Sequence, residues 1–459
     1  MKSRSIDLVE GPVFSGVLRY TVPIILSSVL QLLFNAADLV VVGQFCGSIS
    51  VGAVSATGAI TNLIVNLFVG LSVGAGVSVA HAIGSRSQEV VHRTIHTAIP
   101  VAAISGLVLT AIGVCFSRPL LELMCTPEDV LPLASTYMTI YFMGITFTLL
   151  YNFGASILQA SGDTRSALIY LTIAGVLNVF LNLLFVIVLH MNVAGVALAT
   201  ILSQALSAVL VIRQLMHRTD ACRFIPRMSR IHWEPLCKMV RIGLPAGVQG
   251  CLFSISNVMI QSSINSFGSS TLIAGNGAAG NIEGFVWTSM NAVSQAAVNY
   301  VGQNLGAQKF DRIRKSLLTC LGLVTVLGIT LGCSAYLLGP QLLSFYITDS
   351  PEAIALGHTR LLYICAPYFV CGLMDVFTGA LRGLGKSLLP MLVSVVGVCV
   401  LRIVWIFTIF QIPQFHTPSC LYLSYLISWA LTFLAQSLLF TVSLRKLRRQ
   451  TPEPDLIAY

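Results

Sequence analysis

The chain has 459 residues, of which 56% are hydrophobic and only 9% are charged, and its formal net charge is +9. A soluble domain carries roughly 25% charged residues, so this composition excludes an ordinary soluble protein and predicts an integral membrane protein. The basic residues are spread over separate short stretches beside apolar segments, which argues against nucleic-acid binding.

The apolar segments are long enough to cross a membrane, which takes about 20 residues for ~30 Å of hydrocarbon. They lack the polar–apolar alternation of barrel strands, and bare amides cannot stay unpaired in lipid, so we predict α-helices. Pro23 lies near the start of the first span, where it is a candidate for bending the helix. In chain order the twelve predicted spans are 17–43, 51–80, 94–116, 131–158, 166–189, 193–216, 238–266, 271–303, 316–346, 358–381, 388–411 and 418–444.

Basic residues predict the orientation of these spans. All of them except Arg118, Arg360 and Arg402 fall on one side of the predicted membrane, and both termini lie on that side. The positive-inside rule therefore predicts cytoplasmic termini in the cell membrane. The N-terminal stretch lacks a short apolar core with a small-residue cleavage site, so we expect no removable signal peptide.

The first part of the chain returns 222 residues later without a gap over about seventy residues. Arg19-x-x-x-Pro23 returns as Arg241-x-x-x-Pro245, and Gly84 returns as Gly306. We predict an all-α integral membrane protein with 12 transmembrane helices in two six-helix lobes: residues 1–217, a cytoplasmic connector 218–237, and residues 238–459. Six helices per lobe make the repeat parallel, with its pseudo-two-fold axis along the membrane normal. Such duplication is typical of transporters; packing symmetry alone is the alternative.

A carboxylate inside a span is costly, which makes Asp38 in the first span informative. Its repeat counterpart is Ile260, so the repeat does not need an acid there for packing. Asn178 and Asn182, spaced i, i+4, share a helical face, and Thr200 follows on the next span. Asp38 with these oxygens could hold a hard cation such as Na⁺, or a proton. The alternative is that the asparagines only join helices by hydrogen bonds.

The second half has different charged residues inside its spans: Glu283, Asp375 and Arg402. A lone arginine in lipid is costly, so we expect Arg402 to pair with Asp375; a structural pair and a coupling role both stay open. Glu283 could attract a cationic substrate or form an interhelical hydrogen bond.

No catalytic constellation is present. There is no P-loop, and the 12 cysteines occur without a C-x-x-C motif or a histidine partner at metal spacing. We therefore expect neither an enzyme nor a resident cofactor, and no zinc site or disulfide framework.

Several motifs together resemble the multidrug and toxic compound extrusion (MATE) family, and they cover nearly the whole chain. They are Asn35-Ala-Ala-Asp38, Leu158-Gln-Ala-Ser-Gly-Asp163-Thr-Arg165, Asn178-x-x-x-Asn182, Asn281-Ile-Glu-Gly, Val301-Gly-Gln-Asn-Leu-Gly306 and Leu381-Arg-Gly-Leu-Gly385.

The resemblance implies two six-helix lobes about a central cavity and export of amphipathic, often cationic compounds, driven by inward Na⁺ or H⁺. By position, Asp38, Asn178, Asn182 and Thr200 match the N-lobe cation site of the family. Some members have Asp where this chain has Asn182, which leaves one formal charge at the site. The chain also has no acid in its seventh span, where some members use one; Glu283 and Asp375 could serve instead.

We therefore expect a cation-coupled antiporter that exports small amphipathic, cationic organic compounds by alternating access. Its expected partners are the small-molecule substrate and the lipid bilayer, and we expect a monomer. One alternative is a flippase for a lipid-linked precursor, which a cavity lined by many basic side chains would favour. Another is an ion channel or receptor, which ion current without counter-transport would favour.

Overall fold

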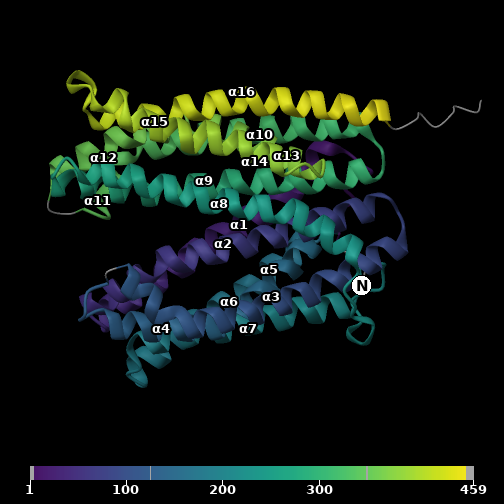
Figure 1. Cartoon of the computed structure of the whole chain (residues 1–459), viewed down its shortest axis with the longest axis horizontal. Coiled ribbons are helices and arrows are strands. Elements are labelled where there is room, and N and C mark those ends of the chain that lie inside the picture. Colours follow the sequence, from purple (N-terminus) through teal and green to yellow (C-terminus); the bar gives the residue numbers. More distant parts are fainter. Residues whose placement is uncertain (1–4, 125, 348–349, 451–459) are drawn as a thin grey trace, which may run out of the picture. The chain divides into compact units, whose positions relative to one another are not determined.

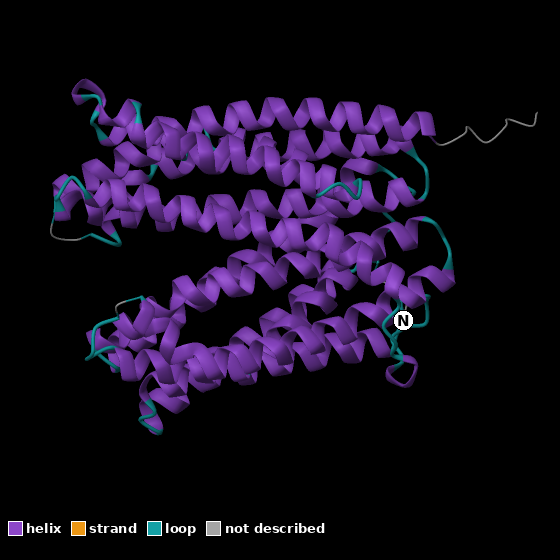
Figure 2. Cartoon of the chain, in the orientation of Figure 1, coloured by secondary structure: helices purple, strands orange, loops and turns teal. Residues whose placement is uncertain are grey.

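The computed structural model describes residues 5–124, 126–347 and 350–450. Across these residues the chain is α-helical, with short 3-10 and π segments and no strand (Figure 2). The all-α prediction is therefore confirmed.

The helices follow one another with short connections (Figure 1). Those of the first half are α1 (Val13–Phe45), α2 (Ser48–Gly84), α3 (Gln88–Leu123), α4 (Leu131–Met143), α5 (Ile145–Ala160), α6 (Thr164–Leu183) and α7 (Asn192–Met216). Those of the second half are α8 (Trp233–Asn265), α9 (Ser270–Gly306), α10 (Phe310–Leu337), α11 (Gly339–Ser344), α12 (Pro351–Ile364), α13 (Phe369–Gly383), α14 (Leu388–Ser394), α15 (Leu401–Phe407) and α16 (Pro418–Gln450). Two π segments, η1 (Leu184–Val188) and η3 (Val395–Val400), continue α6 and α14.

Within the described residues, nine helices are long and apolar enough to cross a membrane. Two bent pairs, α4 with α5 and α12 with α13, qualify when taken together and raise the number to as many as 11; each bends by 47°. The remaining predicted span, 271–303, falls on α9, whose 37 residues reach about 55 Å at ~1.5 Å per residue. Polar side chains are spread along α9, which keeps it out of that group. The count of twelve spans stays a prediction.

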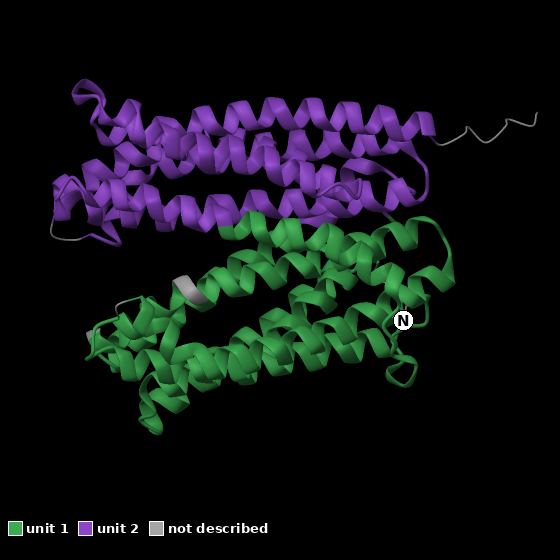
Figure 3. Cartoon of the chain, viewed as in Figure 1, with its two compact units in different colours: residues 1–7, 22–251 green, residues 8–21, 252–459 purple. Residues whose placement is uncertain are grey.

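The chain divides into two compact units (Figure 3). Unit 1 contains the N-terminus through residue 7 together with residues 22–251, and unit 2 contains residues 8–21 and 252 onward. This division differs from the predicted lobes 1–217 and 238–459, because α1 and α8 each begin in one unit and end in the other. Pro23 lies inside α1, where it removes one main-chain donor; its role in bending stays a prediction.

The first part of α8 packs so closely on α2 in unit 1 that only glycine fits at the crossing. A Cβ at Gly70 would lie 2.2 Å from the backbone N of Gly247, and a Cβ at Gly74 would lie 2.2 Å from the carbonyl oxygen of Met239. Small residues four apart on both helices allow such an approach, as in membrane helix pairs generally. This packing explains why residues 233–251 belong to unit 1.

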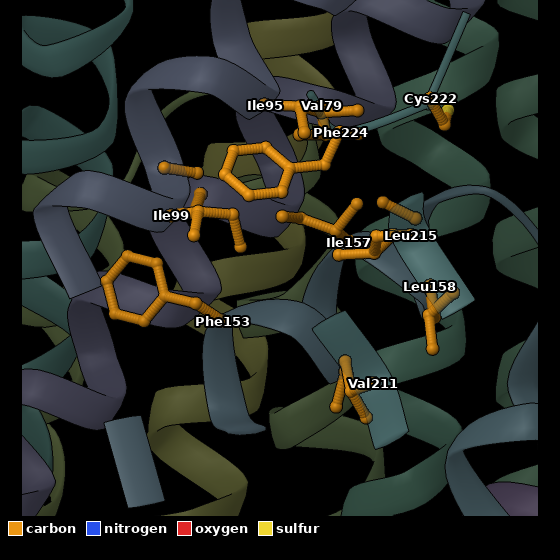
Figure 4. Close-up of a cluster of buried hydrophobic side chains, with 14 of the residues drawn as sticks. Val79, Ile95, Ile99, Phe153, Ile157, Leu158, Val211, Leu215, Cys222 and Phe224 are labelled. Atoms are coloured by element: carbon orange, nitrogen blue, oxygen red, sulfur yellow. The ribbon is translucent and has the colours of Figure 1, made fainter. Parts of the chain in front are cut away.

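A large apolar core of unit 1 lies among α2, α3, α5 and α7 (Figure 4). Ile95, Phe153 and Val211 are among its fully buried members. The connector after α7 closes this core with Cys222 and Phe224, whose side chains are also buried. The connector is therefore part of the packed unit, which a polar stretch in the sequence does not indicate.

In unit 2, a clamp on α10 holds the segment that precedes α1. The Arg312 guanidinium donates to three carbonyls: Nε to Leu8 at 3.3 Å, Nη1 to Gly11 at 2.9 Å and Nη2 to Glu10 at 2.8 Å. Asn304 adds a bond to the Leu8 carbonyl at 3.0 Å. A planar guanidinium with several donors in fixed directions suits such a row of acceptors.

Candidate functional site

Unit 1 brings together the four polar residues that the sequence predicts as a cation or proton site. Asn182 Nδ2 on α6 donates to Asp38 Oδ1 on α1, and also to Asn178 Oδ1 at 3.3 Å. Thr200 on α7 places its Oγ1 3.4 Å from Asp38 Oδ2. Three helices therefore converge on one carboxylate. Its chemical role stays a prediction.

The surroundings of this cluster are apolar on one side and more open on the other. Val41, Val42, Val186 and Val196 form a small buried cluster on the same helices and η1. Asn182 is fully buried and Asn178 is 5% exposed, whereas Asp38 is only partly buried. The asparagines therefore form the fixed part of the site, and the carboxylate is its accessible part.

The Asn182 amide determines what the site can hold. Its N–H faces the Asp38 carboxylate, while its Oδ1 is buried and has no hydrogen-bond partner among the described residues. This orientation stabilises an ionised carboxylate. Turning the amide by 180° would present Oδ1 to Asp38 instead, and amide O and N atoms are exchangeable in this way. An oxygen there suits either a protonated Asp38 or a bound cation.

Thr200 provides a further oxygen. Its hydroxyl donates to the Val196 carbonyl at 3.0 Å, a shorter contact than that to Asp38, so its lone pairs remain for a ligand. Among the described residues no group of three or more His, Cys, Asp or Glu could hold a metal ion. With a single carboxylate, the cluster has the charge to balance one proton or one monovalent cation.

A π-helical segment follows the asparagine pair directly. It runs over Leu184–Val188 and begins two residues after Asn182. Such segments break the regular α-helical hydrogen bonding and are frequent at functional sites. The sequence gives no local signal for this one, because the residues involved are ordinary apolar ones.

Unit 2 contains a buried ion pair that the sequence does not reveal. Arg360 on α12 lies 2.7 Å from Glu283 on α9, and their side chains are 11% and 14% exposed. Arg360 also donates to Asn276 Oδ1, and Tyr368 donates to Glu283 Oε1 at 3.3 Å. Of the two alternatives for Glu283, the interhelical contact is the one present. The available signal was Arg360 inside the predicted span 358–381, because an arginine within an apolar span needs an acid.

The expected pairing of Arg402 with Asp375 is wrong. Arg402 donates from Nε to the Ser428 hydroxyl at 3.0 Å, and its guanidinium lies 3.9 Å from the centre of the Tyr425 ring. No ion pair joins it to Asp375, although the structure describes both residues. An aromatic face and a hydroxyl replace the carboxylate, because arginine stacks well on aromatic rings.

Glu283, Asp375 and Arg402 line two adjoining cavities in unit 2. The larger measures about 370 Å³ and the smaller about 90 Å³. Both are lined by Glu283, Trp287, Tyr368 and Tyr425, and the smaller also by Asp375 and Arg402. The charged residues predicted in the second half therefore share one hollow region, without pairing in the expected way.

A family model described as MatE matches two stretches of the chain, residues 23–184 and 245–408, which together make up more than half of it. The two matches begin 222 residues apart, at the offset of the internal repeat.

Curated relatives match over most of their length. The probable multidrug resistance protein YpnP of Bacillus subtilis (strain 168) is 28% identical over 87% of this chain and 89% of its own. An FAD transporter of Shewanella oneidensis is 26% identical over 87% and 88%. The probable multidrug resistance protein NorM of Thermotoga maritima is 24% identical over 84% and 83%.

Solved structures share the fold. An outward-facing multidrug resistance MATE family transporter of the MOP superfamily matches with a TM-score of 0.90 and 19% identity, over 98% of this chain and 100% of that chain. A MOP superfamily transporter from Pyrococcus furiosus matches with a TM-score of 0.90 and 19% identity, over 98% and 99%.

Proposed function

We propose, from the premise that this chain belongs to the MATE family of multidrug efflux transporters, that it is an antiporter that exports small amphipathic organic compounds in exchange for an inward cation. The chain is a multi-pass membrane transporter and not an enzyme. The coupling ion, the cargo and the cytoplasmic position of both termini are parts of the proposal.

The cluster around Asp38 supports the coupling mechanism. Its carboxylate is the only acid of the cluster, it is partly accessible, and it accepts a hydrogen bond from the buried Asn182, which also donates to the buried Asn178. A cation or proton that binds here more tightly in one conformation shifts the population toward that conformation. Moving a two-state equilibrium from 1:99 to 99:1 requires roughly a 10⁴-fold difference in affinity. A single group can provide this when it faces water in one state and a drier environment in the other.

The donor set at Asp38 supports a proton over sodium. Sodium needs several oxygen ligands in place of its hydration shell, as hard cations do generally. Asn182 directs an N–H toward the carboxylate, and a second carboxylate is missing from the cluster. A proton needs only the acid itself and, after the amide turns, one acceptor oxygen.

The cargo class rests on the relatives. YpnP and NorM are named for multidrug resistance, and the Shewanella oneidensis relative is named an FAD transporter. These names cover drugs in general and one flavin nucleotide. We propose the same breadth for this chain, with organic cations such as ethidium as the first compounds to test.

Reconstituted vesicles test the coupling site. Ethidium counter-transport is followed by fluorescence under a proton gradient and, separately, under a sodium gradient. We expect the wild-type protein to respond to the proton gradient and Asp38→Asn to lose coupled transport while its expression and thermal unfolding stay unchanged. Asp129→Asn, in the exposed loop before α4, removes an acid without touching the cluster and serves as the matched control. Coupled transport that survives Asp38→Asn would remove Asp38 as the coupling site.

A further inference from the structure

The adjoining cavities of unit 2 contain charges that the coupling mechanism does not use. Glu283 and Arg360 neutralise each other across 2.7 Å. Arg402 and Asp375 are of opposite sign and line the smaller cavity without forming an ion pair. One positive and one negative group are therefore left to interact with whatever enters.

Arg402 is arranged as an anchor for an anion. Its side chain is 3% exposed, and within the described part of the chain its single hydrogen bond runs from Nε to Ser428. Both Nη groups are left without a hydrogen-bond partner there, while the Tyr425 ring covers one face of the guanidinium. A guanidinium fixed at Nε and covered on one face presents its remaining donors edge-on, which is the geometry that binds a carboxylate.

Asp375 is its counterpart for a cation. It belongs to α13, and its carboxylate makes no hydrogen bond or ion pair with any other described residue. Arg382, two helical turns along the same helix, attracts it from a distance. Asp375 is partly buried, and an acid withdrawn from water without a direct partner gains from an ammonium group placed beside it.

Aromatic side chains also line the smaller cavity. Tyr368, Trp429 and Trp287 line the smaller cavity, and Trp287 is 45% exposed. On the same helix Gly284 leaves room, because a Cβ added there would meet no atom within 4 Å. Aromatic side chains around an open space suit a planar ring, which they contact by stacking or edge-on packing.

We propose, resting on the transport function above, that this double cavity binds an aromatic zwitterion: a compact molecule with one carboxylate, one protonated amine and a ring. The carboxylate binds the Nη groups of Arg402, the amine binds Asp375, and the ring packs against Trp287 and Tyr368. A ligand with only a positive charge would leave Arg402 facing a like charge, and an anion would do the same to Asp375. A zwitterion meets both groups with the opposite sign.

Equilibrium binding to the purified full-length protein in detergent tests this directly. The probes are two aromatic zwitterions with different charge spacing, L-tryptophan and 4-(aminomethyl)benzoic acid, each with its methyl ester and its N-acetyl derivative. We expect at least one zwitterion to bind about tenfold more tightly than both of its singly charged derivatives, a difference of about 1.4 kcal/mol. Equal binding of a zwitterion and its methyl ester, or no binding of either zwitterion, would overturn the proposal.

Variants assign each charge to its partner. Arg402→Gln is expected to abolish the preference for the zwitterion over the ester, and Asp375→Asn the preference over the N-acetyl derivative. Should either variant fail to fold, as judged by thermal unfolding, Arg402→Lys keeps the charge but loses the planar fork, and we expect it to reduce the first preference about tenfold. A preference that survives in Arg402→Lys and in the other variants refutes the assignment.

Two further variants separate this inference from the coupling proposal. Gly284→Leu fills the cavity without altering either charge and is expected to weaken all six probes alike. Asp38 belongs to the other unit, so we expect Asp38→Asn to leave probe binding unchanged; equilibrium binding needs no ion gradient. If Asp38→Asn loses coupled transport but still binds the probes, the zwitterion proposal is supported. If the wild type shows coupled transport but no preference for a zwitterion, the zwitterion proposal fails and the coupling proposal does not.

Discussion

Removing one partner of the buried Glu283–Arg360 pair should cost far more stability than removing one partner of an exposed pair of the same length. The buried pair spans 2.7 Å with side chains 11% and 14% exposed. The exposed pair, Arg118 with Glu122 on α3, spans 2.8 Å with side chains 71% and 51% exposed. The two pairs have nearly the same length but differ strongly in their access to solvent; the exposed pair lies within one helix, and the buried pair joins two helices.

The magnitude follows from electrostatics. At an effective dielectric constant of ~20, two charges 2.7 Å apart attract by about 6 kcal/mol, and desolvation offsets much of this. Glu283→Gln keeps the buried arginine but removes its countercharge, which should cost about 3–5 kcal/mol. Glu122→Gln should cost about 0.5 kcal/mol or less, because water already solvates that arginine. Replacing both buried partners, as Glu283→Gln with Arg360→Met, should cost less than Glu283→Gln alone.

The assay is reversible unfolding in mixed micelles, in which increasing sodium dodecyl sulfate is followed by circular dichroism. Free energies of unfolding are compared among the wild type, the two single glutamine variants and the double variant. If Glu283→Gln and Glu122→Gln agree within about 1 kcal/mol, or the double variant is no more stable than Glu283→Gln, then Arg360 does not depend on Glu283 and the reasoning fails.

Three further predictions concern the scaffold. Gly74→Ala should cost about 1–3 kcal/mol in the same unfolding assay, because its Cβ would lie 2.2 Å from a carbonyl oxygen of α8, whereas Gly277→Ala, with no atom within 4 Å, should not destabilise. Burial favours the neutral form of Asp220, but the hydrogen bond from Arg218 holds the pKa of this carboxyl below its ordinary 3.8. The ionised Asp220 therefore stabilises the folded protein above pH 3.8, and this stabilisation is lost as the pH falls through the lower pKa of Asp220 in the folded state. Limited proteolysis of the connector in the wild type should become faster over that pH range. Asp220→Asn should remove this pH dependence. Arg312→Lys should speed hydrogen exchange at residues 8–11 on the order of tenfold, since a point charge cannot reproduce three directed bonds; unchanged exchange would contradict the clamp.

The sequence predicts the unit 1 cluster well because its information is local and repeated. Asn178 and Asn182 share a face by helical spacing alone, and Asp38 stands out against its repeat counterpart Ile260. Three apolar helices with few polar side chains offer few other places to bury those groups. Asp38, Asn182 and Thr200 therefore converge, because these helices offer them few other polar partners.

The unit 2 charges are less predictable because their partners are distant and numerous. Glu283 and Arg360 lie 77 residues apart, and several acids, aromatic rings and hydroxyls compete for each arginine. Arg402 donates a hydrogen bond to Ser428 and lies over the Tyr425 ring, whereas pairing opposite charges in the sequence favours Asp375. The bend between α4 and α5 falls at Gly144 and the break between α12 and α13 contains Pro367, both visible in the sequence, whereas the π segment Leu184–Val188 consists of ordinary apolar residues and depends on tertiary packing.

Aligning the two halves by the repeat shows that their acidic residues lie at different positions. Within the gap-free part of the repeat, Asp38 corresponds to Ile260 and Glu283 corresponds to Thr61. Ile260 lines the larger cavity beside Glu283, so the second half keeps a hollow at the repeat-equivalent position and carries its acid on the next helix. Glu283 has an arginine partner, whereas Asp38 has only a neutral amide and a hydroxyl as partners. An acid held by neutral groups can change its charge state without leaving a buried countercharge, and one held by a buried arginine cannot. This contrast supports the proposals that ion coupling takes place in the first half and that the second half recognises cargo.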